Sequence, residues 1–150
     1  MNPDRDEIQR IADGRNDITL HENVSDMKNL ISSMDLCISA AGSTLYEICA
    51  CGVPLITYCL AYNQIAGAEA FSHLGLAINV GDLRDPESVD PQQVMSGRLD
   101  SSAVGMIFSA VDCLAADHDL RVEMGARMQE MIDGCGAERM VREIVTGDSR

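Results

Sequence analysis

Up to residue 80, the chain alternates between short apolar segments and segments in which apolar residues recur at helical spacing. The apolar segments predict four strands, at 17–21, 36–39, 53–59 and 76–80. The helical spacing predicts helices at 4–13, about 27–34, 44–51 and 63–74, with Gly14, Gly52 and Gly75 as stops. Such alternation predicts an α/β fold with a parallel sheet. Strand 53–59 is apolar throughout, so we expect helices on both faces of that sheet.

The last third of the chain predicts helices alone. Apolar residues form three stripes at helical spacing: Val104, Ile107, Phe108, Val111 and Leu114; Leu120, Met124, Met128 and Met131; and Met140, Val141, Ile144 and Val145. Methionines in such stripes usually fill a core. Residues 81–100 are polar and rich in turn formers, which predicts a loop. We find no repeat and no second apolar pattern, so we interpret residues 1–150 as one domain.

The charge balance narrows the classes of partner. There are 11 basic and 24 acidic residues, and the net charge is −13. Nucleic acids and anionic membranes select basic surfaces and are therefore poor partners. No apolar run reaches the roughly 18 residues of a membrane span, and the first residues lack the features of a secretory signal. The negative charge does not exclude a small anionic ligand, because backbone N–H groups at a helix start can hold one.

The six cysteines give no sign of a metal site. Cys37 and Cys59, for example, sit inside apolar runs, as buried free thiols do. No C-x-x-C pair occurs and the three histidines are scattered, so neither a zinc site nor a cofactor is predicted. Reduced core cysteines predict a cytoplasmic protein.

The segment from Ile38 to Glu47 carries the strongest sign of chemistry. A strand ends, small residues make a tight turn around Gly42, and a helix begins at Ser43 and Thr44. Gly42 allows a ligand close to the backbone, and the unpaired N–H groups of the first helical turn form an anion site, most naturally for phosphate. Ligands of open α/β sheets bind at this edge. The stretch matches neither the dinucleotide nor the P-loop motif.

A purely structural interpretation of the same residues stays open. Thr44-x-x-Glu47 also fits a capping box, in which Thr44 caps the helix and Glu47 bonds back to it. Spacing alone gives the capping role and the ligand-binding role of Glu47 equal weight.

Two further segments carry polar side chains between a strand and a helix. Asn63 and Gln64 follow strand 53–59 and offer donors and acceptors that suit sugar hydroxyls; capping of the next helix by Asn63 is the alternative. After strand 17–21, Asn23 or Ser25 is a predicted cap. His21 is interpreted as a strand-end residue rather than a catalyst.

Together these segments resemble the C-terminal domain of the two-domain GT-B sugar-nucleotide enzymes. The nearest resemblance is to the nucleotide-sugar hydrolase of pseudaminic acid synthesis, and a more distant one is to the N-acetylglucosaminyltransferase of peptidoglycan synthesis. The matching segments follow the family's order along the chain: Asn23 to Met27, Met34 to Leu36, Ser39 to Glu47, Gly52 to Pro54, Asn63 and Gln64, and Asp133 to Arg139. The resemblance implies a Rossmann-like parallel sheet, the C-terminal half of a GT-B fold.

The resemblance also implies roles in binding a UDP-sugar. The Gly42-Ser43-Thr44 turn would hold the diphosphate, and Glu47 would accept hydrogen bonds from the ribose hydroxyls. Asn63 and Gln64 would face the sugar or the phosphates, and the backbone near Val24 would touch uracil. The catalytic base belongs to the family's N-terminal domain, so we name no catalytic residue in this chain.

Some parts of the family's fold lie outside this sequence. Two strands precede the helix that matches 4–13 in the family, so we expect an N-terminally truncated domain that lacks them and the partner N-terminal domain. The strand order 3-2-1-4-5-6 places 36–39, 53–59 and 76–80 in parallel, in that order. Strand 17–21 either pairs with 36–39 or leaves a gap beside it. We favour the gap, and the exposed edge then allows a homodimer.

Two functional hypotheses follow. The first is the UDP-sugar-binding domain of a nucleotide-sugar hydrolase or glycosyltransferase, which acts on an activated amino sugar in cell-surface glycan synthesis. The alternative is a non-catalytic, stand-alone module that binds a nucleotide sugar or a partner protein.

Overall fold

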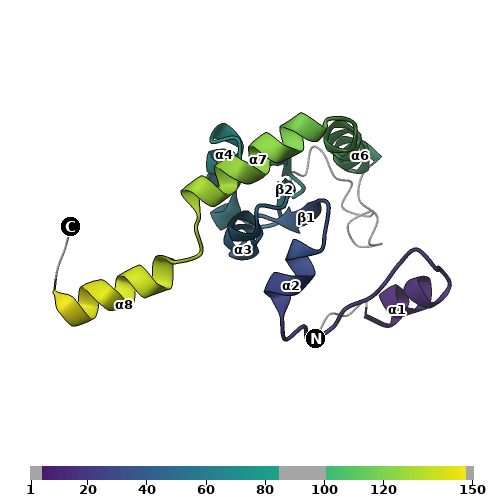
Figure 1. Ribbon diagram of the computed structural model, residues 1–150. Coiled ribbons are helices and arrows are strands. Elements are labelled where there is room, and N and C mark those ends of the chain that lie inside the picture. The colour runs from purple at the N-terminus through teal and green to yellow at the C-terminus, as the bar shows by residue number, and fades with distance from the viewer. Residues whose placement is uncertain (1–4, 85–100, 148–150) are drawn as a thin grey trace.

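The computed structural model describes residues 5–84 and 101–147, with the backbone alone at 101–103 (Figure 1). Its sheet consists of β1 (Cys37–Ala40), β2 (Leu55–Cys59) and β3 (Ile78–Asp82), which pair in parallel in that order. The predicted order of 36–39, 53–59 and 76–80 is therefore confirmed. Each strand begins one or two residues later than predicted.

The central strand is the most deeply buried part of the sheet. Leu55, Ile56 and Thr57 are fully buried in β2. The Thr57 hydroxyl donates to the Ser39 carbonyl of β1 at 3.0 Å, so a polar side chain is accommodated between apolar neighbours. Pro54 stands just before β2, where its lack of an N–H costs no ladder bond, and its carbonyl accepts from the Cys37 amide at 2.8 Å.

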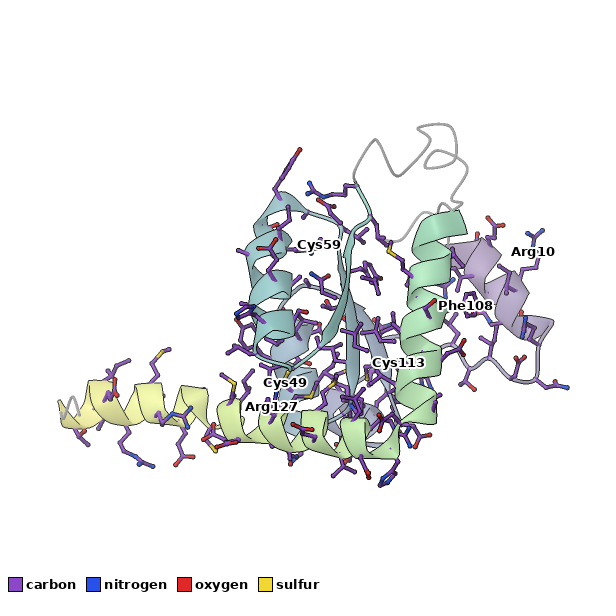
Figure 2. All side chains as sticks on the ribbon, turned by 90° about the horizontal axis from the view of Figure 1, so that it is seen from above. Arg10, Cys49, Cys59, Phe108, Cys113 and Arg127 are labelled. Carbon is purple, nitrogen blue, oxygen red and sulfur yellow. The ribbon has the colours of Figure 1, made fainter. Side chains whose placement is uncertain are left out.

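Helices cover both faces of the sheet, as the apolar character of 53–59 predicted. On one face lie α3 (Thr44–Cys51) and α4 (Tyr62–His73), which meet through an edge-to-face contact of Tyr46 and Phe71 with 5.3 Å between ring centroids. On the opposite face α6 (Ser101–Ala116) packs on β2 and β3 (Figure 2). The predicted α/β fold class with a Rossmann-like arrangement is confirmed.

One further helix, α7 (His118–Met131), packs against α3 and completes the core. Leu114 of α6 and Met124 and Met128 of α7 are buried, so these parts of the predicted stripes fill the core. Phe108, in contrast, is 62% exposed. The predicted loop at 81–100 falls outside the described residues from 85 onward.

The last helix does not join the core. α8 (Gly136–Thr146) extends away from the rest of the domain (Figure 1) and has no buried residue. Met140, Val141, Ile144 and Val145 are all at least 60% exposed. Core filling by this final stripe was therefore a wrong prediction, because no described element lies against the apolar face of α8.

The N-terminal segment differs from its prediction. Helix α1 (Arg5–Asp13) forms as expected, but residues 17–21 are exposed and adopt no strand. A strand needs a neighbour for its backbone groups, and none of the described strands lies beside this segment. The local contacts are ion pairs instead, from Arg15 to Asp17 and from Arg5 to Glu22. His21 is therefore an exposed loop residue.

The cap of α2 (Met27–Ser32) is also different from the prediction. Asp26, not Asn23 or Ser25, is the N-cap, and its carboxylate accepts from the Asn29 amide at 3.0 Å. Asn23 instead takes a left-handed conformation with φ of 51°. Such a conformation suits asparagine better than most residues.

The outer edge of β1 stays open in the part of the chain that the structure describes. No ladder joins residues 17–21 to β1, which is the first strand in the sheet order. Of the two predicted outcomes, the favoured gap is the one observed. Ile38 on this strand is 48% exposed.

Candidate functional site

The candidate site lies at the carboxyl edge of the sheet. Parallel strands place Ala40, Cys59 and Asp82 at the same edge, and the chain turns there into α3, into α4 and into residues 83–84. Helices α3 and α4 both begin at this edge on the same face. Because a helix start presents unpaired N–H groups and the positive end of the helix dipole, the edge favours an anion.

The turn at 41–43 is held by backbone hydrogen bonds that leave two amides free. Ala41 donates to the Tyr58 carbonyl at 2.8 Å, which fixes the turn to β2. Leu45 donates to the Gly42 carbonyl at 3.2 Å. The amides of Ser43 and Thr44 have no partner among the described residues, and both residues are exposed. The turn therefore presents two donors to solvent at the start of α3.

Gly42 occupies open space at this turn. A Cβ placed on it would meet nothing within 4 Å, and its φ is not positive. Neither backbone conformation nor packing within the described residues requires a glycine at this position. The glycine therefore leaves the space beside the free amides open.

Glu47 stands one turn into α3 with a free carboxylate. The N-cap of α3 is Ser43, whose side chain makes no capping bond, and Thr44 is the first helical residue. The capping box is therefore not formed, and the capping alternative was wrong for this turn. The exposed Glu47 carboxylate has neither a hydrogen bond nor an ion pair to any described residue.

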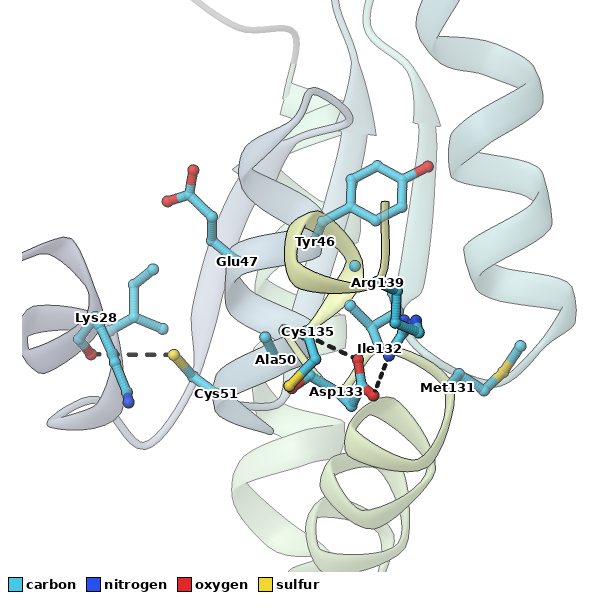
Figure 3. A pocket seen from close by; sticks show the side chains of 13 residues that line it. Lys28, Tyr46, Glu47, Ala50, Cys51, Met131, Ile132, Asp133, Cys135 and Arg139 are labelled. Atoms are coloured by element: carbon cyan, nitrogen blue, oxygen red, sulfur yellow. Dashed lines mark hydrogen bonds and ion pairs between the residues drawn. The ribbon is translucent and has the colours of Figure 1, made fainter. Parts of the chain in front are cut away.

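Glu47 also lines a groove with a volume of about 870 Å³, drawn in Figure 3. Helices α2 and α3 and the connection from α7 to α8 form its walls. Lys28 and Arg139 stand on different sides of it, and Ile31, Ala50 and Ile132 contribute apolar surface. The volume lies within the range of small-molecule sites. Sequence reasoning did not identify Lys28, because an isolated lysine between helix-forming residues gives no local signal.

The far wall of the groove is built by the segment Asp133 to Arg139. The Asp133 carboxylate accepts from the Arg139 guanidinium at 2.5 Å and from the Cys135 amide at 2.9 Å. The hydrogen bond from Arg139 is the main cause that lowers the pKa of Asp133. This segment carried part of the sequence resemblance, and the structure brings it close to α3 although it lies more than eighty residues further along the chain.

Asn63 and Gln64 lie in the first turn of α4. Ala61 is the N-cap and Asn63 is the second helical residue, so capping by Asn63 was a wrong alternative. The Gln64 side-chain oxygen accepts from the Leu60 amide at 2.7 Å. This bond fixes the orientation of the Gln64 side chain and leaves its NH₂ group to donate.

The structure brings the predicted residues together in part. The Gly42 turn and the start of α4 share the carboxyl edge, and Glu47 is the predicted residue that lines the groove. Val24 is half-buried in the segment that leads to α2 and does not line the groove.

A third group at the same edge was missed by sequence reasoning. The Arg84 guanidinium binds the Asp82 carboxylate through Nε at 3.0 Å and Nη2 at 2.7 Å, and this bond is the main cause that lowers the pKa of Asp82. The Arg84 Cζ also lies 3.9 Å from the ring centroid of Tyr62, which is 84% exposed. The sequence signal for this group was an arginine two residues after an aspartate, just after the end of a predicted strand.

The described residues contain neither a metal-binding cluster nor a membrane-spanning helix. No group of three or more His, Cys, Asp or Glu side chains in this part of the chain is arranged to hold a metal ion. None of the described helices is both long and apolar enough to cross a membrane.

The fold and this edge define a class: a Rossmann-like domain with a turn of free amides where β1 meets α3. The chain belongs to the glycosyltransferase family 28 C-terminal domain family, whose sequence profile matches residues 2–95. It is therefore a sugar-nucleotide-binding domain of the glycosyltransferase type, with the C-terminal half of a GT-B fold.

One curated relative is the spore coat polysaccharide biosynthesis protein SpsG of Bacillus subtilis (strain 168), which is 29% identical over 79 residues. The alignment covers 53% of this chain and 23% of that protein. The matched part of the chain thus spans about a quarter of its relative. No solved structure matches the chain.

Proposed function

We propose that the chain binds a UDP-sugar at the turn from Gly42 to Glu47. The diphosphate oxygens accept from the free amides of Ser43 and Thr44, and the ribose hydroxyls donate to Glu47. The observation that carries the proposal is the unpaired Glu47 carboxylate one turn beyond two unpaired amides. A carboxylate that accepts from hydroxyls and amides that donate to phosphate are complementary to the two parts of a nucleoside diphosphate.

The surroundings of the turn fit the remaining parts of such a ligand. The groove beside Glu47 has room for the nucleoside. Contact of uracil with the backbone near Val24, which does not line the groove, rests on the sequence resemblance alone. On the other side of the turn, Asn63 and Gln64 lie in the first turn of α4 at the same edge, and their amide groups suit the phosphates or the sugar. In this arrangement the ligand lies across the starts of α3 and α4.

The protein to which this domain belongs is proposed to be a UDP-sugar hydrolase or a glycosyltransferase. The family supports the glycosyltransferase type. The name of the Bacillus relative, a polysaccharide biosynthesis protein, supports a role in cell-surface glycan synthesis. An activated amino sugar as substrate, and a relation to pseudaminic acid synthesis, rest on the sequence resemblance alone. So does the assignment of the catalytic base to a second domain. The six free thiols support a cytoplasmic location.

A second candidate is a non-catalytic interaction module. The observation that favours it is the exposed apolar face of α8. The open edge of β1 supports the related proposal of a homodimer. Light scattering over a range of concentrations checks the dimer: a mass that stays at that of one chain contradicts it.

Calorimetric titration of the chain with UDP, ADP and GDP tests the proposed function. UDP should bind most tightly, and Glu47→Ala should weaken UDP binding by about 1.5–3 kcal/mol, the usual contribution of a hydrogen bond to a charged group. Glu143→Ala on α8 is the matched control, because it removes another exposed carboxylate that does not line the groove. Equal UDP affinity in wild type and Glu47→Ala, with unchanged melting temperatures, removes the ribose role. A wild-type chain that binds no UDP overturns the function.

A further inference from the structure

We infer that Arg84 is an anion-binding group of this site and takes a phosphate oxygen of the ligand's diphosphate. The inference rests on the proposed function and adds a residue to it. Arg84 is the second residue after β3, at the carboxyl edge that also carries the turn and the starts of α3 and α4.

The side chain is held in one orientation by two neighbours. Asp82 occupies Nε and Nη2 of Arg84, and the Arg84 Cζ lies over the exposed ring of Tyr62. A guanidinium has five N–H donors in a fixed plane. The two hydrogens on Nη1 therefore stay available, and they have no acceptor among the described residues. A fixed guanidinium binds a phosphate with little loss of side-chain entropy.

The position fits a ligand that spans the edge. Neighbouring strands lie about 4.8 Å apart, so the ends of β1 and β3 are separated by roughly 10 Å. The Arg84 guanidinium lies over Tyr62, the first residue of α4. Since α4 follows the central strand β2, the side chain extends from β3 toward β1. The free NH₂ group of Gln64, from the same turn of α4, adds a donor at this edge.

A charged donor at this edge would help the acidic chain to bind a diphosphate, which a purely structural ion pair would not do. The chain has a net charge of −13, which opposes the approach of a diphosphate. Helix starts supply only partial positive charges. Asp82 offsets the charge of Arg84, but the Nη1 hydrogens of the guanidinium remain to donate a charge-assisted hydrogen bond to a phosphate oxygen. Lys28 and Arg139 line the groove instead. If Arg84 merely closed the end of β3, its removal would change stability and leave UDP affinity alone.

The test compares the affinities of the full chain for UDP and for uridine, which lacks the phosphates. Arg84→Gln should weaken UDP binding about tenfold, the effect of one charge-assisted hydrogen bond, and leave uridine binding unchanged. Glu47→Ala should weaken both ligands, because it contacts the ribose. Arg142→Gln on α8, which removes an arginine from an exposed ion pair with Glu138, is the matched control for the change in charge.

A second pair of variants examines the stacking partner. Tyr62→Phe keeps the ring and should bind UDP as the wild type does, whereas Tyr62→Ala should weaken it in the direction of Arg84→Gln. UDP binding by wild type with no loss in a folded Arg84→Gln chain overturns the inference and leaves the proposed function intact. A wild-type chain that binds neither ligand overturns both.

Discussion

Whether a side chain at the carboxyl edge can donate to or accept from a ligand depends on the hydrogen bonds that it already makes. Gln64 has its oxygen engaged by the Leu60 amide, so it can only donate to a ligand. Glu47 has no partner among the described residues, so its carboxylate is available as an acceptor. The difference follows from position: Gln64 is the third residue of α4, where such a side chain commonly bonds back to the helix start, whereas Glu47 is the fourth residue of α3.

Burial also decides the reactivity of the thiols. Cys49 is completely buried in α3, and desolvation raises its pKa to about 12 from an ordinary value of 9.0. We predict that a thiol reagent at pH 8 modifies the exposed Cys113 and Cys135 within the folded chain and reaches Cys49 only on unfolding. Mass spectrometry of modified peptides measures this. Modification of Cys49 at the rate of Cys113 contradicts the prediction.

The same shift has a consequence for stability. A thiol whose pKa is higher in the folded chain keeps its proton there while the unfolded chain loses it, so the folded state is favoured less as pH rises from about 9 toward 12. Urea unfolding of wild type and Cys49→Ala over this pH range isolates the contribution. The wild type should lose stability more steeply with pH than the variant, and parallel curves contradict the assignment.

At the scale of elements, the contact between α3 and α7 depends on two glycines. Gly52 ends α3 in a left-handed conformation with φ of 70°, and its carbonyl oxygen would lie 2.5 Å from a Cβ placed on Gly125. We predict that Gly125→Ala lowers the free energy of unfolding by about 1–3 kcal/mol, since backbone must move to admit the methyl group. Urea unfolding measures the change.

A matched glycine on another helix gives the control. Gly105 lies inside α6, and a Cβ there would meet nothing within 4 Å. Gly105→Ala should raise stability by about 0.5–1 kcal/mol, because alanine loses less backbone entropy in a helix. Equal effects of the two substitutions contradict the α3–α7 contact.

The elements that the sequence predicted correctly are those with local signals. Helix 44–51 has the predicted bounds, because the strand, the small residues and Gly52 all lie next to it. The strand order came from the family resemblance and is confirmed. Residues 17–21 failed as a strand, because a strand depends on a distant neighbour that local pattern does not reveal.

The parts of the site that have local signals in the sequence were also predictable. The turn at Gly42 and the place of Asn63 and Gln64 at the sheet edge follow from the alternation of strands and helices. Lys28 and the stacking of Arg84 on Tyr62 could not be found in this way, and Arg139 entered only as part of a segment that matches the family. These residues reach the groove or the edge through tertiary contacts between segments far apart in the sequence.

For the whole molecule, we predict that the chain alone turns over no UDP-sugar. By the family resemblance the catalytic base comes from a second domain, so this chain supplies binding without a base. Incubation of the purified chain with UDP-linked amino sugars, followed by measurement of UDP, should show no release above background. Release that follows the protein through successive purification steps contradicts the prediction.

Because α8 extends away from the core, the rate at which its amide hydrogens exchange reports whether a partner covers the helix. An 11-residue helix with no buried residue is marginal in water. Its amide hydrogens should therefore exchange with deuterated solvent within seconds, while those of β2 stay protected for as long as the domain is folded. Any partner that covers Met140 to Val145 will slow this exchange in proportion to the time that it stays bound. Slow exchange of α8 in dilute chain alone would mean that a second copy already covers it.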